Sequence, residues 1–282
     1  MEVASASVQA EVLPELGARV HRLRVFRQDL LRTPIHVSAY EAEPFFWGSF
    51  VMAPWCNRID ARRVMASGRL IQVPANVADG SAIHGQVYRL PWELQVDGSL
   101  RVEHGGHGWP WRYEASLLVT PGEGWLRMQH TLTNRSDEPM PGGLGMHPWF
   151  RRPIRVAIRG DSVFSPNSDT PAVPAAVDGS LDLRELRDMP PGLDATWTDL
   201  DMPLVELEWP DLRIAATMRA EPRPMFVVAA SPPDIGAIAV EPQTHAPQGL
   251  RRLLRGEPGG LTLIQPGGSM SLGVELAFRT LG

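Results

Sequence analysis

A histidine and a glutamate, each followed by a proline, are the residues of this chain best placed to move protons. His147 lies in the segment 145–150, which reads Gly-Met-His-Pro-Trp-Phe. The residue before a proline is pushed out of the helical region towards extended backbone. We therefore expect His147 at a strand end or rim, with its ring held in one direction. A packed loop with a structural histidine is the alternative, and this segment alone fits both.

Glu241 follows an apolar run that begins at Ala237, and Pro242 comes directly after it. A proline cannot donate to a sheet ladder. The pattern predicts that the strand stops at Glu241 and leaves its carboxylate in apolar surroundings, where a general base is well placed. A structural role, in which Glu241 binds a backbone N–H or an arginine, fits these residues equally.

Two shorter segments carry further polar side chains. Arg58, in the Asn-Arg-Ile sequence at 57–59, has a rigid fork of N–H donors that suits hydroxyl or carboxylate oxygens. A structural ion pair would use the same fork. His84 precedes Gly85, and a glycine allows another part of the backbone to approach closely beside the imidazole. His245 lies near Glu241 in the sequence and is expected at the same rim.

Metal and lysine chemistry find little support in the sequence. His104 and His107 lie in a Gly-rich turn without a third ligand at suitable spacing, and Cys56 is the one cysteine of the chain. We therefore predict no metal site. All 27 basic residues are arginine, which excludes Schiff-base lysines, pyridoxal-phosphate attachment and a phosphate-loop lysine.

The overall composition is that of an ordinary soluble protein. The chain has 282 residues, of which 43% are hydrophobic and 21% charged, with a net charge of -5 and a pI of about 5.9. This charge gives no reason to expect a nucleic-acid or anionic-membrane partner. No apolar run approaches the ~20 residues that span a bilayer. The start of the chain lacks the features of a signal peptide, so a cytoplasmic location is expected.

The hydrophobic periodicity is that of strands. Residues 125–132 and 270–278 alternate between apolar and polar positions, as half-buried strands do. Shorter runs with turn residues between them are typical of an all-β sandwich or barrel; they lie at 8–13, 19–26, 70–73, 100–103, 114–119, 154–158, 204–209, 212–218, 225–229, 235–240 and 261–264. No linker or repeat divides residues 1–282, which predicts a single domain.

Other segments are assigned by composition. Residues 181–188 and 248–255 are each long enough for a turn or two of helix, and 166–179 reads as a long surface loop. The arginines between Arg19 and Arg32 are predicted to form a solvated strand face, with their aliphatic stems lying over apolar surface.

Taken together, the polar segments resemble the aldose 1-epimerase (galactose mutarotase-like) family. The matching pieces occur in the family's order: Asn-Arg-Ile at 57–59, Ile-His-Gly at 83–85, the stretch 134–150 ending in Gly-x-His-Pro-Trp-Phe, Leu193-Asp194, and Glu-Pro-Gln-Thr at 241–244. The resemblance extends from about residue 48 to about residue 268. Each motif is short, but five of them in order are fairly specific.

The resemblance implies a β-supersandwich of large, mostly antiparallel sheets with a sugar cleft on one face. It implies that Glu241 is the general base and His147 the general acid. The residues it assigns to substrate binding are Arg58, His84, Asp194, Asn57, Trp149 and Gln243. Asp194 matches the family pattern loosely, and Trp149 replaces the tyrosine that commonly follows His-Pro, which would affect ring stacking and substrate choice.

The chemistry of these residues agrees with the activity implied, the interconversion of the α and β anomers of a hexose. Mutarotation removes a proton from the anomeric hydroxyl while the ring oxygen gains one. Ordinary pKa values near 4.3 for Glu and 6.5 for His make a carboxylate and an imidazolium the useful pair. A carboxylate beside His147 is expected to raise the pKa of the imidazole. No metal or organic cofactor is needed.

Three alternatives stay open at this point. A hexose-6-phosphate 1-epimerase would use Arg151 with Arg152, or Arg62 with Arg63, to bind phosphate. A carbohydrate-binding protein without activity would share the fold. A glycoside hydrolase would need two opposed carboxylates, for which Glu241 has only Asp194 as a distant partner. The expected partner is a small sugar, and the chain is expected to be a monomer or homodimer.

Overall fold

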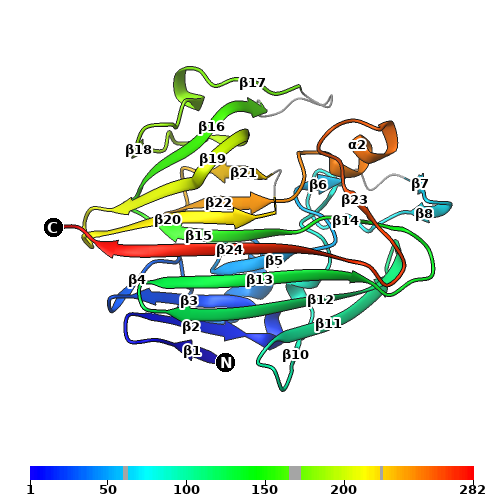
Figure 1. The fold of residues 1–282 in the computed structure, drawn as a ribbon, viewed down its shortest axis with the longest axis horizontal. Helices are drawn as coiled ribbons and strands as arrows, with labels where there is room; N and C mark the ends of the chain where they lie inside the picture. The colour runs from blue at the N-terminus through cyan, green and yellow to red at the C-terminus, as the bar shows by residue number, and fades with distance from the viewer. Residues whose placement is uncertain (60–62, 165–172, 223–224) are drawn as a thin grey trace.

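Strands dominate the computed structural model, which describes residues 1–59, 63–164, 173–222 and 225–282 (Figure 1). The helices are short: α1 (Ala39–Ala42), α2 (Gly249–Arg255) and three 3-10 turns at Pro14–Leu16, Val87–Arg89 and Gly179–Leu181. None of the helices in the described ranges is long and apolar enough to cross a membrane.

Eighteen strands of the described residues form one large sheet. They are β1 (Glu2–Ala4), β2 (Val8–Leu13), β3 (Arg19–Val25), β4 (Gln28–Asp29), β5 (Ser49–Met52), β10 (Glu93–Leu94), β11 (Leu100–Gly106), β12 (Trp109–Gly122), β13 (Trp125–Asn134), β15 (Gly145–Arg151), β16 (Arg155–Phe164), β17 (Ala175–Ala176), β18 (Arg187–Asp188), β19 (Asp194–Trp209), β20 (Ile214–Glu221), β21 (Phe226–Ala230), β22 (Ala237–Gln243) and β24 (Ser269–Thr280). Three small two-stranded sheets pair β6 (Arg58–Ile59) with β9 (Ala82–Ile83), β7 (Val64–Ala66) with β8 (Arg69–Ile71), and β14 (Met140–Gly142) with β23 (Thr262–Ile264).

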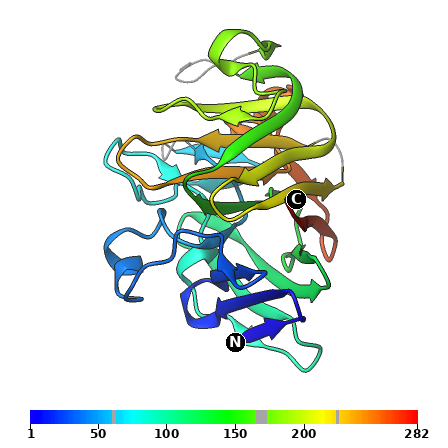
Figure 2. The same ribbon diagram turned by 90° about the vertical axis from the view of Figure 1, so that its left-hand side faces the viewer.

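The long strand β19 pairs with different strands along its two halves, and the large sheet curls at this point. Its C-terminal half pairs with β20, and from there the antiparallel ladders continue through β24, β13, β12 and β11 to β10. Its N-terminal half pairs with β21, which leads through β22, β15, β5, β3 and β2 to β1. In Figure 1, β24 (red) runs between β13 and β20. The turned view places the N-terminal strands (blue) at one end of the molecule and β16 and β19 (green to yellow) at the other (Figure 2).

The core follows the alternation read from the sequence. Leu126, Met128 and Leu132 point inward from β13, and Leu272, Val274 and Leu276 do so from β24. The two halves of the curled sheet enclose one large apolar cluster, which includes the indoles of Trp55, Trp109, Trp111, Trp197 and Trp209. The prediction of an all-β supersandwich of mostly antiparallel sheets is confirmed.

A strand forms at each predicted position, and most boundaries move by a few residues. The larger differences are at β19, which begins ten residues before the predicted 204–209, and at β16, which ends six residues after the predicted 154–158. The helix at 248–255 is confirmed as α2, but the helix predicted at 181–188 is wrong. Leu183 accepts a backbone hydrogen bond from Ile158, and β18 pairs with β16. A neighbouring strand therefore supplies the hydrogen bonds that would otherwise close a helix.

The predicted solvated arginine face between residues 19 and 32 is wrong at its first member. Arg19 is buried, with 1% of its surface exposed, whereas Arg22, Arg24 and Arg32 are partly exposed and Arg27 is exposed. In the loop predicted at 166–179, residues 166–172 lie outside the described ranges. The remainder contains the short strand β17, so it is not entirely irregular.

Trp197 should be one of the largest single contributors to stability. Its side chain is fully buried, and its indole N–H donates to the carbonyl of Leu181 at 3.0 Å. Trp197→Ala should lower the free energy of unfolding by about 3–5 kcal/mol, since it leaves a cavity in the core. Urea denaturation would measure the loss. Leu118→Ala, at a position 40% exposed, is the control and should change stability by less than about 0.5 kcal/mol. Equal effects of the two substitutions would contradict the packing described here.

Candidate active site

Adjacent strands bring His147 and Glu241 face to face. β15 pairs with β22 through Gly145↔Gln243 on one side of these residues and Trp149↔Ala239 on the other, so the same register sets His147 opposite Glu241. His147 also pairs with Phe50 of β5. Glu241 pairs with Val228 of β21, which pairs with Thr196 of β19. We call this line across five strands the central row: Phe50, His147, Glu241, Val228 and Thr196.

Both catalytic candidates lie in the middle of their strands, which corrects the expected strand-end positions. β15 continues past His147 to Arg151, and β22 continues past Glu241 to Gln243. Pro148 and Pro242 supply no N–H, and both lie in the stretch between the two flanking pairs of the β15–β22 ladder. Neither proline stops its strand. A contact between side chains joins the two strands at this point.

In that contact His147 Nε2 and Glu241 Oε1 lie 3.1 Å apart, at ion-pair distance. Only 4% of His147 and 3% of Glu241 is exposed. Burial lowers the pKa of His147 well below its usual range, and the His84 and Arg19 side chains lower it further. Burial raises the pKa of Glu241 well above its usual range. The expected rise in the pKa of His147 is therefore wrong, because desolvation of both groups favours their uncharged forms.

Gln243 fixes the other oxygen of the Glu241 carboxyl. Its side-chain N–H donates to Glu241 Oε2 at 2.9 Å, and this bond lowers the pKa of Glu241 against the effect of burial. Asn57 donates to Gln243 Oε1 at 2.8 Å and accepts from its amide nitrogen at 3.2 Å. The two amides, both predicted to bind substrate, thus bond to each other and hold Gln243 with its donor towards the carboxyl.

His84 lies beside the pair because of an unusual backbone turn. His84 has φ 63° and Gly85 φ 73°, and a Cβ at Gly85 would come within 2.0 Å of the carbonyl oxygen of Ala53. The turn packs the imidazole of His84 edge-on against that of His147, with ring centroids 4.9 Å apart. Burial lowers the pKa of His84 to about 3, and the charge of Arg58 contributes to this. His84 is therefore neutral at pH 7.

Arg58 and Asp194 form the more open part of the site. The Arg58 guanidinium donates to Asp79 at 2.9 Å, so the structural ion pair considered from the sequence is present. Asp194 is exposed, but the protein around it desolvates the carboxyl and raises its pKa, while Arg58 lowers it. The charge of Asp194 in turn raises the pKa of Glu241. Asp194 lies two residues along β19 from Thr196 of the central row, and Arg58 pairs with Ile83, the residue before His84.

Trp149 is as deeply buried as the pair itself, with 3% of its surface exposed. It lies two residues from His147 on the same side of β15, with ring centroids 5.2 Å apart. Its indole N–H donates to the carbonyl of Phe45, and its ring packs against Phe46. The structure therefore uses Trp149 to connect β15 to the segment before β5.

Sequence reasoning missed the aromatic side chains around the pair. Phe50 stacks on His147, with ring centroids 4.5 Å apart and an angle of 21° between the planes. Phe45 packs against Phe50 and His84. Neither phenylalanine stands in a recognisable motif. The residues of β5 are all buried and do not alternate between polar and apolar types, so the sequence carries no signal for the position of Phe50.

His245 has a structural role, because both of its ring nitrogens are bonded to the backbone. It accepts a hydrogen bond from the backbone N–H of Cys56 at 2.9 Å and is bonded through Nδ1 to the carbonyl of Ala246 at 2.8 Å. Burial lowers its pKa to about 4. The imidazole is buried, which corrects the expected place at a rim, and it ties residue 56 to residue 246 behind Glu241.

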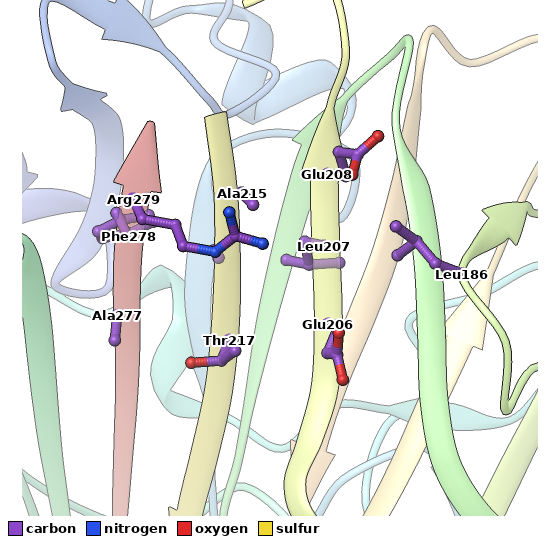
Figure 3. A pocket seen from close by; sticks show the side chains of 10 residues that line it. Leu186, Glu206, Leu207, Glu208, Ala215, Thr217, Ala277, Phe278 and Arg279 are labelled. Carbon is purple, nitrogen blue, oxygen red and sulfur yellow. The ribbon is translucent and has the colours of Figure 1, made fainter. Parts of the chain in front are cut away.

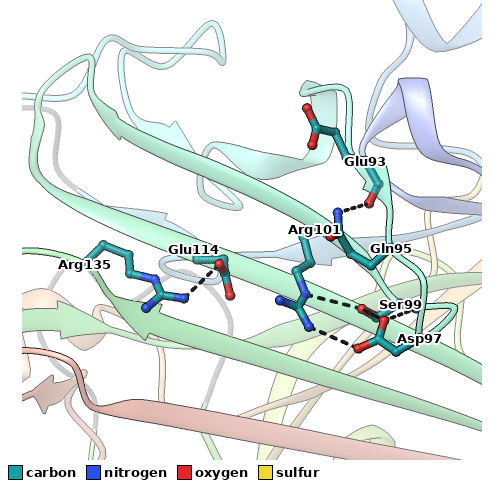
Figure 4. A network of polar contacts seen from close by, with 7 residues as sticks. All are labelled: Glu93, Gln95, Asp97, Ser99, Arg101, Glu114 and Arg135. Atoms are coloured by element: carbon teal, nitrogen blue, oxygen red, sulfur yellow. Dashed lines mark hydrogen bonds and ion pairs between the residues drawn. The ribbon is translucent and has the colours of Figure 1, made fainter.

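Two other polar regions are weaker candidates. A cavity of about 180 Å³ lies over β19, β20 and β24 between Glu206, Glu208 and Arg279, with small residues at its floor (Figure 3). Its volume is below the ~300–1,000 Å³ of most ligand pockets. A network on the β10–β12 surface joins Arg101 to Asp97 and Arg135 to Glu114 (Figure 4). These are exposed ion pairs of ordinary kind. Among the described residues, no three His, Cys, Asp or Glu side chains gather to hold a metal ion.

Gly85 should be less tolerant of a side chain than a glycine with similar backbone in open space. Gly85→Ala meets both the left-handed φ and the contact with Ala53, whereas Gly98→Ala, with φ 80° and nothing within 4 Å, meets the φ alone. Gly98→Ala should cost about 1–2 kcal/mol. Gly85→Ala should cost a further ~1–3 kcal/mol from overpacking. Chemical denaturation of both variants tests this, and equal losses would show that the close approach has no energetic effect.

Both the sequence and the fold of this chain are similar to those of known proteins. The family profile described as "Aldose 1-epimerase" matches residues 4–194, more than half of the chain. The uncharacterized protein YphB of Escherichia coli K12 is 28% identical over 104 residues. That match spans 36% of this chain and 36% of the relative, so the similarity in sequence covers about a third of either protein.

Solved structures match over nearly the whole length. A galactose mutarotase-like protein from Clostridium acetobutylicum superimposes with a TM-score of 0.83 at 19% identity, covering 99% of this chain and 95% of the other. The galactose 1-epimerase of Lactobacillus acidophilus NCFM gives a TM-score of 0.77 at 15% identity, covering 99% and 93%. At such identities the likeness establishes a shared fold. With the family profile, it shows that this chain belongs to the aldose 1-epimerase family.

Proposed function

We propose that this protein interconverts the α and β anomers of an aldohexose by acid–base opening and closure of the sugar ring. The observation that carries the proposal is the buried contact of 3.1 Å between His147 Nε2 and Glu241 Oε1. A carboxyl and an imidazole in contact supply one proton acceptor and one proton donor side by side. Ring opening needs both, because the hydroxyl oxygen on C1 loses a proton while the ring oxygen O5 gains one. The two groups must lie close together, since both oxygens are bonded to C1.

The reaction conserves protons at every stage. The Glu241 carboxylate takes the proton of the hydroxyl on C1, and the electrons of that O–H bond form the C1 carbonyl. The bond between C1 and O5 breaks, and its electron pair takes the proton of His147 Nε2. Rotation about C1–C2 presents the other face of the aldehyde. Closure returns both protons and yields the opposite anomer.

The environment of the pair keeps the required proton available. Desolvation favours a protonated carboxyl with a neutral imidazole, whereas the bond from Gln243 favours the carboxylate. Both arrangements hold one shared proton and have no net charge. We infer that ligand binding needs only to move this proton from Glu241 to His147, without uptake from solvent. Reprotonation from solvent would be slow at groups so deeply buried.

Neighbouring side chains are suited to hold the sugar. Arg58 and Asp194, the exposed members of the site, offer donors and acceptors for ring hydroxyls. His84 is neutral, so it offers a donor or an acceptor without adding charge. Asn57 and Gln243 already bond to each other. We assign them to orienting Glu241 in addition to any contact with substrate.

The observations favour an unphosphorylated sugar. Arg151 pairs with Asp211 at 3.0 Å, and Arg152 donates to the Ser231 hydroxyl, so both candidate phosphate ligands have other partners. Arg63 is exposed, and Arg62 lies outside the described residues. The site itself contains two carboxyl groups, Glu241 and Asp194. These carboxyl groups, and the pairing of Arg58 with Asp79, disfavour a phosphate at the site.

Replacement of the proposed base tests the activity. Glu241→Gln keeps the shape of the side chain but cannot accept the proton, so anomer exchange should fall roughly 10²–10⁴-fold. Saturation-transfer NMR or polarimetry on a panel of aldoses and their 6-phosphates measures the rate. Glu206→Gln, which removes a carboxylate on the outer sheet face, is the matched control and should retain full activity.

Three outcomes separate the candidate functions. Loss of exchange in Glu241→Gln alone supports the epimerase. Faster exchange of 6-phosphates than of free sugars would support the phosphate-specific alternative. Sugar binding by the unmodified protein with no exchange in any member of the panel would refute the proposal in favour of a binding protein.

The pH dependence should reveal the role of Gln243. Gln243→Met removes the donor that lowers the pKa of Glu241, so that pKa rises further. The acid limb of the bell-shaped profile of kcat/KM should then move to higher pH. A hydrogen bond to a charged group is worth roughly 1.5–3 kcal/mol, and about 1.4 kcal/mol corresponds to one pKa unit. A shift of about one unit or more is therefore expected, with exposed Gln265→Met as control. An unmoved acid limb would argue against Glu241 as the base.

A further inference from the structure

Arg19 extends the central row by one strand. β3 pairs with β5 through Val20↔Ser49, and the antiparallel register therefore sets Arg19 opposite Phe50. Because β15 pairs with the other side of β5, Phe50 stands between Arg19 and His147. Arg19 is 1% exposed, and within the described part of the chain no carboxylate lies within ion-pair distance of it. A buried cation without a partner of opposite charge is costly, so its contacts need an explanation.

The guanidinium of Arg19 binds one segment of backbone at two points. Nη1 donates to the carbonyl of Trp47 at 2.7 Å, and Nη2 donates to that of Pro44 at 2.8 Å. The guanidinium also lies over the rings of Tyr40, at 4.5 Å, and Phe50, at 4.7 Å. Burial lowers the pKa of Arg19 to about 10, which leaves it charged at pH 7. A rigid fork and a delocalised charge suit these four contacts together.

Residues 44–47, which Arg19 binds, touch the candidate site directly. The ring of Phe45 packs against His84, with centroids 5.5 Å apart, and its carbonyl accepts the indole N–H of Trp149. On the sheet side, Phe50 stacks against His147. Arg19 therefore reaches both histidines of the site through one intervening residue each. It reaches neither histidine directly.

We propose that Arg19 is a positioning residue, whose guanidinium fixes Phe50 and residues 44–47 and thereby holds His147 and His84 in place for ring opening. The assignment rests on the proposed anomer exchange for its kinetic part. Nothing in the sequence marks Arg19 for this role, since it lies on a strand with several partly exposed arginines. Its burial and its position at the end of the central row distinguish it from them.

The charge of Arg19 adds an effect that packing alone would not produce. His147 is faced by Glu241 from β22, by His84 from the turn after β9, and by the uncharged rings of Phe50 and Trp149. The positive charge of Arg19, behind Phe50, lowers the pKa of His147 because it disfavours a second cation. Removal of that charge should therefore raise the pKa of His147.

Two substitutions at Arg19 separate the effect of its charge from that of its two hydrogen bonds to the carbonyls of Pro44 and Trp47. Arg19→Met removes both, whereas Arg19→Lys keeps a charge but cannot present two donors in the same rigid geometry. Arg24→Met is the matched control, since Arg24 is on the same strand but pairs with Asp29 at the surface. Each variant is measured by NMR titration of the His147 ring, kcat/KM for anomer exchange, and thermal unfolding.

The proposal predicts a distinct pattern for each variant. Arg19→Met should show a raised pKa of His147 and about a 10–100-fold loss in kcat/KM, the scale expected from a small misplacement of reacting groups. Arg19→Lys should show a near-normal titration of His147 with a loss of kcat/KM. Arg24→Met should match the unmodified protein in both. If Arg19→Met does not fold, the comparison of Arg19→Lys with Arg24→Met still tests the role of the two hydrogen bonds from Arg19 to residues 44–47.

Two results would overturn the proposal. One is unchanged kcat/KM and an unchanged titration of His147 in Arg19→Met. The other is a lowered melting temperature as the single effect of both Arg19 variants, which would make Arg19 a structural residue only. The NMR titration needs no substrate, so absence of anomer exchange in the unmodified protein would refute the proposed function while leaving the coupling of Arg19 to His147 open to measurement.

Discussion

The register of the curled sheet is the constraint on which the site depends. Side chains alternate between the two faces of a strand, so a slip of one residue in the β15–β22 pairing would move His147 to the opposite face from Glu241. The flanking pairs, Gly145↔Gln243 and Trp149↔Ala239, prevent that slip. Gly145 is part of this constraint, since a Cβ there would lie 2.6 Å from the sulfur of Cys56. Correct pairing and the site are thus specified together.

Burial changes the pKa values of His147 and Glu241. In water, a histidine has the higher pKa of the two and holds a proton in preference to a glutamate. Within the sheet, desolvation opposes this preference, because it raises the pKa of Glu241 and lowers the pKa of His147. A proton that either group can hold is suited to a reaction in which one oxygen loses a proton as another gains one. Gln243 adjusts the balance from its position two residues along β22.

The surroundings of the pair divide into a fixed and an open side. Arg19 holds Phe50 and residues 44–47 from behind, and Trp149 is bonded to Phe45 of that segment. Arg58 and Asp194 remain exposed, where a sugar would bring its hydroxyls. Membership of the aldose 1-epimerase family agrees with this division. A rigid apolar support behind the reacting groups and polar contacts in front suit a small, uncharged substrate.

The sequence by itself determined the strand content and the family, and it singled out His147 and Glu241 as the candidate acid–base pair, because alternation and short motifs are local properties. It did not determine that His147 and Glu241 lie in mid-strand. A proline predicts the end of a strand only where the ladder needs its N–H, and Pro148 and Pro242 lie between the paired positions of the β15–β22 ladder. Nor did it reveal the bond between Asn57 and Gln243, the burial of Trp149, or Arg19 at the end of the central row. Those features depend on pairing between strands distant in sequence. Only the tertiary structure sets which side chains share a row and which of them lose contact with water.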